Sequence, residues 1–108
     1  MHSEDFSRSD RLSDLIKSEI SEILRDNVKD PRLQGLTVIR VELSKDIKKA
    51  LIFYSPFNSF NDINTEDIEE GLLKAKSFIR KVLAKRLKIK RLPEIFFEAD
   101  KLEFLEIR

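Results

Sequence analysis

The spacing of hydrophobic residues along this chain of 108 residues predicts one order of elements: helix, strand, strand, long helix, strand. The first helix can be capped by Ser9 or Asp10 and runs to about Asn27, before the proline of Asp30-Pro31 stops it. Its apolar residues recur every three or four positions, as in a helix with one buried side: Leu12, Leu15, Ile16, Ile20, Ile23 and Leu24.

Three strands are predicted around the second helix. After a turn at Gly35, residues 37–43 alternate between two faces, with Ile39, Val41 and Leu43 on one and Val38, Arg40 and Glu42 on the other. A second strand over 50–55 follows a short polar turn, so the two form a hairpin. Pro56 indicates that this strand lies at an edge or ends there. The third strand, over 94–99, follows Pro93.

The second helix begins at Asn64 or Thr65 and leads into an unusual run of positive charge, residues 74–91. The chain has a net charge of only +1, yet this run contains no acidic residue and nine basic ones: Lys74, Lys76, Arg80, Lys81, Lys85, Arg86, Lys88, Lys90 and Arg91. Bases near a helix C-terminus suit the helix dipole, but that effect fades within about one turn. It does not explain Lys74 or Lys76. The run therefore predicts a surface for a polyanion, with a solvated helix face as the alternative.

Helical phase divides this run into two flanks. At about 100° per residue, the second helix has one apolar stripe: Ile68, Leu72, Ala75, Ile79, Val82 and Leu83. One side of the stripe carries a basic flank of Lys74, Lys81, Lys85 and Lys88. Lys76 and Arg80 lie on the other side, and Phe78, at the edge of the stripe, is expected in the core. Arg86 falls within the stripe, where an unpaired charge would cost several kcal/mol, so we expect the helix to bend, change phase or fray before it.

The order of elements predicts a single α+β domain with helices on one face of a three-stranded sheet. The chain has no Cys, one His and two Gly, which excludes disulfides, thiolate metal sites, nucleophile–histidine pairs and glycine-rich phosphate loops. We therefore expect no enzyme activity, cofactor or metal. The polar N-terminus, with residues 1–8 expected to be flexible, and the short apolar stretches predict a cytoplasmic protein without membrane contact. We also expect a monomer.

Several short motifs, in their order and spacing, resemble one known family. They are Lys29 to Leu33, Gly35 to Val38, Arg40 to Glu42, Ser44, Asp46, Ala50, Leu73 to Phe78 and Leu87 to Glu94. Together they cover essentially the whole chain, which is similar to ribosome-binding factor A proteins. The resemblance implies a K-homology-like domain of the type II arrangement and no enzyme activity.

The family resemblance also implies a function and partners. It implies an assembly factor that binds the free 30S ribosomal subunit and 16S rRNA, supports late maturation and 5′-end rRNA processing, and is linked to growth in the cold. Ribosomal proteins are further candidate partners. The family lacks the GxxG loop of ordinary K-homology domains and has an Ala-x-Gly kink in the long helix, which Ala75, Lys76 and Ser77 match here. Serine replaces glycine, and its hydroxyl can bend a helix by bonding to a carbonyl one turn earlier.

The basic run and the resemblance together predict contacts with rRNA phosphates. The candidate RNA-binding residues are Lys74, Lys76, Ser77, Arg80, Lys81, Lys85, Lys88, Lys90 and Arg91. Recognition of shape and backbone suits structured RNA, because its deep major groove excludes side chains. We expect Asp30 and Arg32 to form an ion pair that holds the turn after the first helix, in preference to contacting RNA.

Two other functions fit the sequence. One is a general nucleic-acid-binding module unconnected with ribosomes. The other is a protein-interaction adaptor, because strand alternation directs Val38, Leu51, Phe53 and Phe96 away from the helices. The apolar residues of 101–108 offer a cover for that face, and we predict that this segment folds against or beside it.

Overall fold

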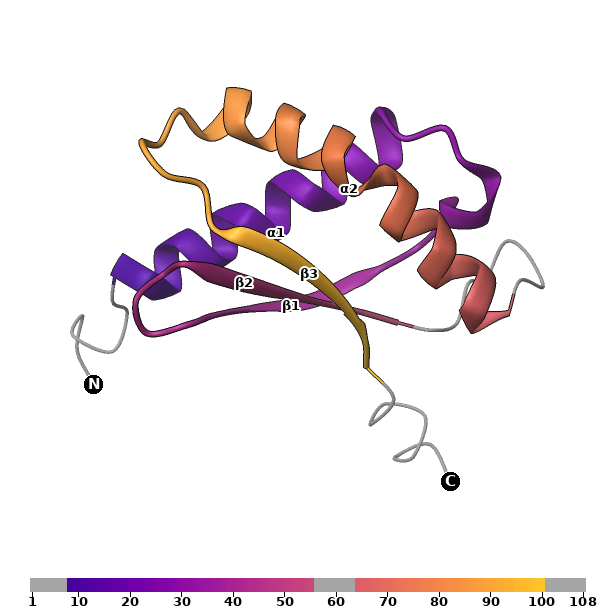
Figure 1. The fold of residues 1–108 in the computed structure, drawn as a ribbon, viewed down its shortest axis with the longest axis horizontal. Helices are drawn as coiled ribbons and strands as arrows, with labels where there is room; N and C mark the ends of the chain where they lie inside the picture. The colour runs from indigo at the N-terminus through magenta and orange to yellow at the C-terminus, as the bar shows by residue number, and fades with distance from the viewer. Residues whose placement is uncertain (1–7, 56–63, 101–108) are drawn as a thin grey trace.

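The computed structural model describes residues 8–55 and 64–100, and it confirms the predicted order of elements. The elements are α1 (Arg8–Asp26), the short 3-10 helix η2 (Pro31–Leu33), β1 (Val38–Leu43), β2 (Lys49–Tyr54), α2 (Thr65–Leu87) and β3 (Glu94–Ala99). Both helices lie on the same face of the sheet (Figure 1). Ser9 and Asp10 lie within α1, so the prediction that one of them caps this helix is wrong.

The sheet has the strand order β1-β2-β3, with β2 in the centre. β1 and β2 pair antiparallel, which confirms the hairpin, whereas β2 and β3 pair parallel. A parallel pair requires a long crossover connection, and α2 lies within it. The edge position considered for the second strand is therefore wrong. The alternative, a strand end, is right, because β2 ends at Tyr54; Pro56 itself lies outside the described residues.

A bulge in β1 corrects the predicted strand faces. Val38 pairs with Tyr54 but Arg40 pairs with Phe53, so Ile39 is an extra residue on its strand. Val38 is consequently buried with the core and does not face away from the helices. From Arg40 onward the predicted alternation holds. Leu51, Phe53 and Phe96 are half-buried and alternate with core residues, so they occupy the face opposite the helices. The predicted cover, 101–108, lies outside the described residues.

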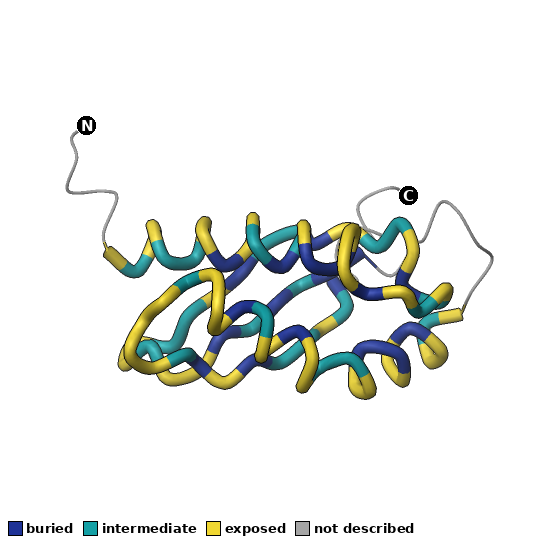
Figure 2. Tube along the Cα trace, turned by 90° about the horizontal axis from the view of Figure 1, so that it is seen from above, coloured by how far each residue is buried: buried dark blue, intermediate teal, exposed yellow. Residues whose placement is uncertain are grey.

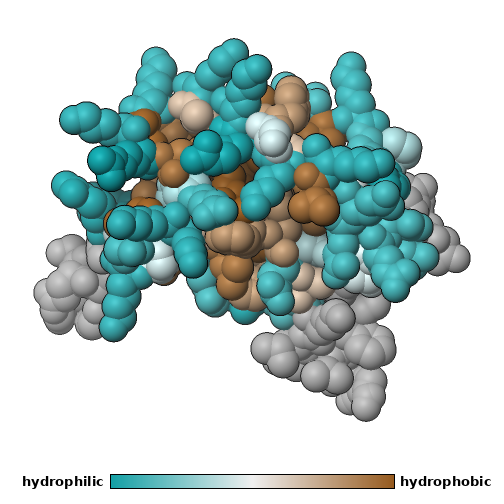
Figure 3. All heavy atoms as spheres, viewed as in Figure 1, coloured by the Kyte–Doolittle hydropathy of each residue, from teal (hydrophilic) through white to brown (hydrophobic). Residues whose placement is uncertain are grey.

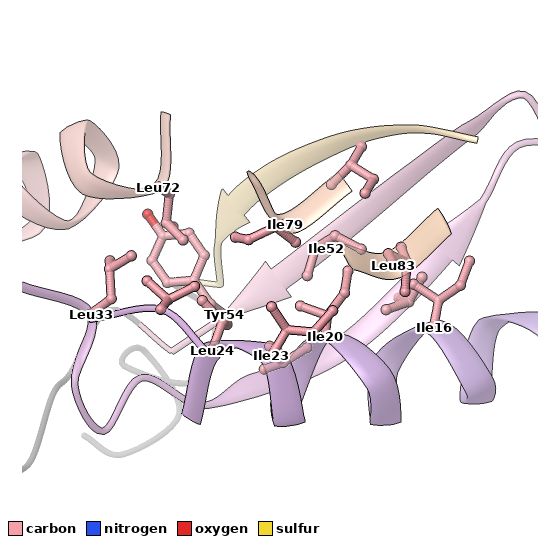
Figure 4. Packing of buried hydrophobic residues seen from close by; sticks show 14 of the residues in the cluster. Ile16, Ile20, Ile23, Leu24, Leu33, Ile52, Tyr54, Leu72, Ile79 and Leu83 are labelled. Atoms are coloured by element: carbon pink, nitrogen blue, oxygen red, sulfur yellow. The ribbon is translucent and has the colours of Figure 1, made fainter. Parts of the chain in front are cut away.

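The core lies between the two helices and the sheet (Figure 4). α1 buries Ile16, Ile20, Ile23 and Leu24, α2 buries Ile68, Leu72, Ile79 and Leu83, and the sheet adds Ala50, Ile52, Tyr54 and Ile95. Around each turn of α1, the buried residues lie on the side that faces the rest of the molecule and the exposed residues lie on the opposite side, as its apolar spacing predicts (Figure 2). Leu15 is an exception, because it belongs to the predicted stripe but is 44% exposed.

The turn after α1 packs directly onto α2 at Gly71. Asp30 caps η2 by accepting from the Arg32 backbone N–H at 3.0 Å, and its carboxylate pairs with the Arg32 guanidinium at 2.7 Å. This confirms the predicted ion pair. A Cβ at Gly71 would lie 3.2 Å from Leu33 Cδ2 and 3.3 Å from Asp30 Oδ2. A glycine at this point of α2 therefore lets the turn approach the helix closely.

Replacing Asp30 by asparagine is expected to destabilise the fold at neutral pH and to have little effect in acid. Hydrogen bonding to Arg32 lowers the pKa of Asp30 below its ordinary value of about 3.9. The ion pair therefore stabilises the fold above that value, and the contribution disappears as pH falls through the lowered pKa. Asparagine preserves the cap but not the charge, so urea denaturation should show a loss of about 0.5–1 kcal/mol at pH 7. An equal loss of stability at a pH below the pKa of Asp30 would show that the effect comes from packing and not from the ion pair.

Candidate nucleic-acid interface

The ends of α2 are fixed by local hydrogen bonds that also separate its charges. Asn64 caps the helix by accepting from the Asp67 backbone N–H at 2.8 Å, which confirms one of the two predicted starts. At the other end Lys88 adopts a left-handed conformation with φ 55°, and its backbone N–H donates to the Ala84 carbonyl. Acidic residues occupy the first turn and basic residues the last, as the helix dipole favours.

Arg86 is held by polar residues on and directly after α1, and of the three irregularities considered before it, fraying is wrong because the helix is continuous there. α2 continues to Leu87, and the Arg86 Nη1 atom donates to Glu19 at 2.9 Å and to Glu22 at 2.8 Å. Its Nη2 atom donates to Asn27 at 3.1 Å, and the side chain is 29% exposed. Hydrogen bonds to Glu19 and then Glu22 raise the pKa of Arg86. Three partners thus satisfy this cation at the junction of the helices, and it is not available to an outside anion.

Two further cations of the run contact the segment around β3. The Lys76 ammonium lies 4.6 Å from the centre of the Phe96 ring, within the range of a cation–π interaction. Arg80 donates from Nη2 to the Leu92 carbonyl at 3.4 Å. These residues are one turn apart, on the flank opposite the basic flank, as the helical phase predicts. Both have partners within the fold, so they are weaker candidates for RNA binding than their charge alone indicates.

The basic flank faces solvent along the second half of α2. All four of its lysines are exposed, and Lys74 pairs with Glu70, which is also exposed, at 3.7 Å. Such a pair contributes little to stability and can exchange its partner. Within the described parts of the chain, no carboxylate forms an ion pair with Lys81, Lys85 or Lys88. Hydrophilic side chains crowd the upper part of the molecule, where α2 lies (Figure 3). The positive charge of Lys81, Lys85 and Lys88 is therefore available to an anion.

The segment that connects α2 to β3 extends the basic surface. Lys90 and Arg91 lie in this segment, and both are exposed. Their position directly after Lys88 places them beyond the end of the basic flank. The structure thus divides the nine basic residues into three groups: Arg86 toward α1, Lys76 and Arg80 toward β3, and the remaining six toward solvent.

Ser77 and Phe78 lie beside the basic flank, and both are exposed. The prediction that Phe78 joins the core is wrong, because it is 44% exposed. One residue along, Ile79 is fully buried, and a rotation of about 100° per residue turns Phe78 out of the stripe. The ribbon of α2 changes direction near its middle (Figure 1), while the helix is continuous from Thr65 to Leu87. The assignment of a kink to Ala75, Lys76 and Ser77 stays a prediction.

Residues 8–55 and 64–100 contain neither a cluster of metal ligands nor a helix that could span a membrane. No group of three or more His, Cys, Asp or Glu in these ranges could hold a metal ion. No helix in them is long and apolar enough to cross a membrane.

Comparison with known proteins gives consistent matches. The sequence model described as "Ribosome-binding factor A" matches residues 8–104. A ribosome-binding factor A from Dictyoglomus thermophilum is 48% identical over 94 residues, which cover 86% of this chain and 77% of that protein. One from Syntrophus aciditrophicus is 43% identical over 95 residues, covering 88% and 76%.

Solved structures show the same similarity. The crystal structure of ribosome-binding factor A from Thermus thermophilus matches with a TM-score of 0.73 and 28% identity, covering 84% of this chain and 93% of that one. A homology model of the Thermus thermophilus factor, fitted into a cryo-electron microscopy map of a 30S complex, matches with a TM-score of 0.68 and the same identity and coverage.

Proposed function

The chain belongs to the ribosome-binding factor A family, and we propose that it binds the 30S ribosomal subunit as an assembly factor. As a member of this family it is a binding protein and not an enzyme. The proposal is supported by the related Thermus thermophilus protein that has been fitted into a map of a 30S complex. The observation that carries it within this molecule is the basic flank, in which Lys81, Lys85 and Lys88 are exposed and form no ion pair with a described residue.

The basic flank binds phosphates of 16S rRNA in this proposal. Lys74 and Lys88 are 14 residues apart, which corresponds to about 21 Å along a helix axis. A row of this length can contact several phosphates, whereas a single ion would engage only one part of it. Each neutralised phosphate releases condensed counterions, which supplies binding free energy that does not depend on base sequence. Lys90 and Arg91 extend the contact beyond the helix.

The consequence of binding follows the family resemblance. We propose that the protein supports late maturation of the small subunit and processing of the 5′ end of 16S rRNA. A charged helix on a packed α+β scaffold suits recognition of RNA backbone and shape, since the core fixes the direction of α2 through Ile79 and Leu83. The Arg86 contacts with Glu19 and Glu22 hold the same end of the helix against α1.

Sedimentation with purified ribosomal particles tests this function. The protein is expected to bind 30S particles more tightly than it binds 50S particles or an equal mass of mixed RNA. Its affinity for 30S should fall steeply as salt rises, because phosphate contacts release counterions. Equal binding to mixed RNA would indicate a general nucleic-acid-binding module. Binding to 30S that is insensitive to salt would instead indicate apolar docking to a ribosomal protein.

Substitutions at Ser77 test whether close approach to the middle of α2 matters for binding. Ser77→Leu is expected to weaken 30S binding more than it changes the melting temperature, because the residue is exposed and its bulk would face the ligand. Ser77→Ala should be mild, and Ser77→Gly should bind normally at a cost of about 1 kcal/mol or less in stability. Equal 30S affinity for Ser77→Leu and the unchanged protein would remove Ser77 from the interface.

A further inference from the structure

We infer that Phe78 stacks on an unpaired base of single-stranded RNA while the lysines around it bind the neighbouring phosphates. This inference rests on the proposed function and specifies its ligand: a single-stranded segment beside or within the structured RNA. It departs from the expectation that Phe78 belongs to the core and that the basic flank contacts RNA through phosphates alone.

The position of Phe78 is the first support. Among the described residues, four large apolar side chains are prominently exposed, namely Leu15, Leu73, Phe78 and Ile89. Phe78 is the aromatic one, and it lies beside the basic flank. Lys74 precedes it by four residues and Lys81 follows it by three, and residues at these separations are neighbours on a helix surface. An aromatic ring between cations is the arrangement by which proteins hold single strands.

The state of the ring is the second support. Two other phenylalanines in the described part of the chain have a cation over the ring: Arg40 lies 3.9 Å from the centre of Phe53, and Lys76 lies 4.6 Å from that of Phe96. No lysine or arginine within 8–55 and 64–100 is placed over the ring of Phe78 in this way. Its neighbouring lysines are thus available for phosphates, and the exposed ring is available for another π system.

The chemistry of RNA selects the ligand. In a duplex the base faces are stacked on one another, so a phenyl ring finds only sugars, phosphates and base edges. An unpaired nucleotide presents a base face and a phosphate together, which matches the pairing of Phe78 with Lys74 and Lys81. Stacking on an aromatic side chain tolerates any base, because every base has a π face. We therefore expect a preference for single strands with little preference for sequence.

Binding of short RNAs to the full chain tests this inference. The probes are an oligoribonucleotide containing the fluorescent base 2-aminopurine and a hairpin duplex of equal length. The unchanged protein is expected to quench the 2-aminopurine fluorescence of the single strand and to bind it more tightly than the duplex. Phe78→Leu, which keeps an apolar side chain but removes the ring, should abolish the quenching and lower single-strand affinity roughly tenfold, with duplex affinity unchanged. Phe78→Tyr retains a ring and should preserve both.

Matched variants separate this inference from the proposed function. Leu15→Ala alters an apolar side chain on α1 with the same 44% exposure, and it should leave the binding of both RNAs unchanged. If Phe78→Leu binds both RNAs like the unchanged protein while a Lys81→Glu, Lys85→Glu variant loses both, stacking is overturned and the phosphate-binding function stands. If Phe78→Leu weakens binding to 30S but not to either RNA, the ring contacts a ribosomal protein and stacking is again overturned. If the unchanged protein does not bind 30S, the proposed function itself fails.

Discussion

Replacing Lys81, Lys85 and Lys88 together by glutamate is expected to abolish binding to 30S particles while the protein stays folded. These side chains are exposed, and none forms an ion pair with a described residue, so their replacement breaks no ion pair of the described fold. Reversal replaces attraction to phosphates by repulsion. Each lost phosphate contact should also reduce the slope of log K against log salt concentration by about 0.7 to 0.9. Sedimentation over a series of salt concentrations measures both effects.

The control for this variant makes the same change of charge at residues outside α2 and its basic flank. Lys17, Lys45 and Lys48 are exposed on α1 and on the hairpin turn, and their replacement by glutamate alters the net charge equally. The affinity of this control for 30S should fall by no more than a few fold, since the change weakens only the long-range attraction between the protein and the RNA. Circular dichroism should show both variants folded. Unchanged affinity in the α2 variant would reduce the basic flank to a solvated helix face.

Replacing Ile79 by alanine is expected to destabilise the protein by about 2–5 kcal/mol. Ile79 is fully buried between α2, α1 and the sheet, so truncation removes apolar contacts and leaves a cavity among residues that include Ile52 and Leu83 (Figure 4). A typical domain has about 5–15 kcal/mol of total stability, so this loss is a large fraction of it. Chemical denaturation with urea measures the change in the free energy of unfolding.

Leu73→Ala is the matched control on the same helix. Leu73 is 73% exposed, so its truncation should change stability by about 0.5 kcal/mol or less. A similar loss for Leu73→Ala and Ile79→Ala would show that the stability of α2 does not depend on its buried stripe.

Much of the fold was predictable because it depends on local periodicity. The three-four spacing in α1 and α2 and the alternation in β2 and β3 reflect burial of one side of each element. The spacing of apolar residues in the sequence predicts which side that is. The cap at Asn64 and the ion pair of Asp30 with Arg32 were predictable for the same reason, since both partners lie within three residues.

The candidate site was predicted less completely, because charge alone does not show which cations already have partners. Nine basic residues are visible in the sequence of residues 74–91, but one of them, Arg86, is neutralised by Glu19 and Glu22, more than 60 residues earlier in the chain. Lys76 is placed over Phe96, a residue of another element. Such pairings depend on how α2 crosses α1 and β3, and no local pattern encodes that crossing.

The sequence by itself determined the family, the order of the elements and the presence of a basic flank, because motifs and periodicities are local properties of the chain. Only the tertiary structure decided that β2 is central, that Ile39 forms a bulge and turns Val38 inward, and that the turn at Asp30 packs against α2 at Gly71. It also decided that Phe78 is exposed while Arg86 is neutralised. The physical reason is common to all of these features: each depends on contacts between segments far apart in the chain, whose geometry is set when the helices pack onto the sheet.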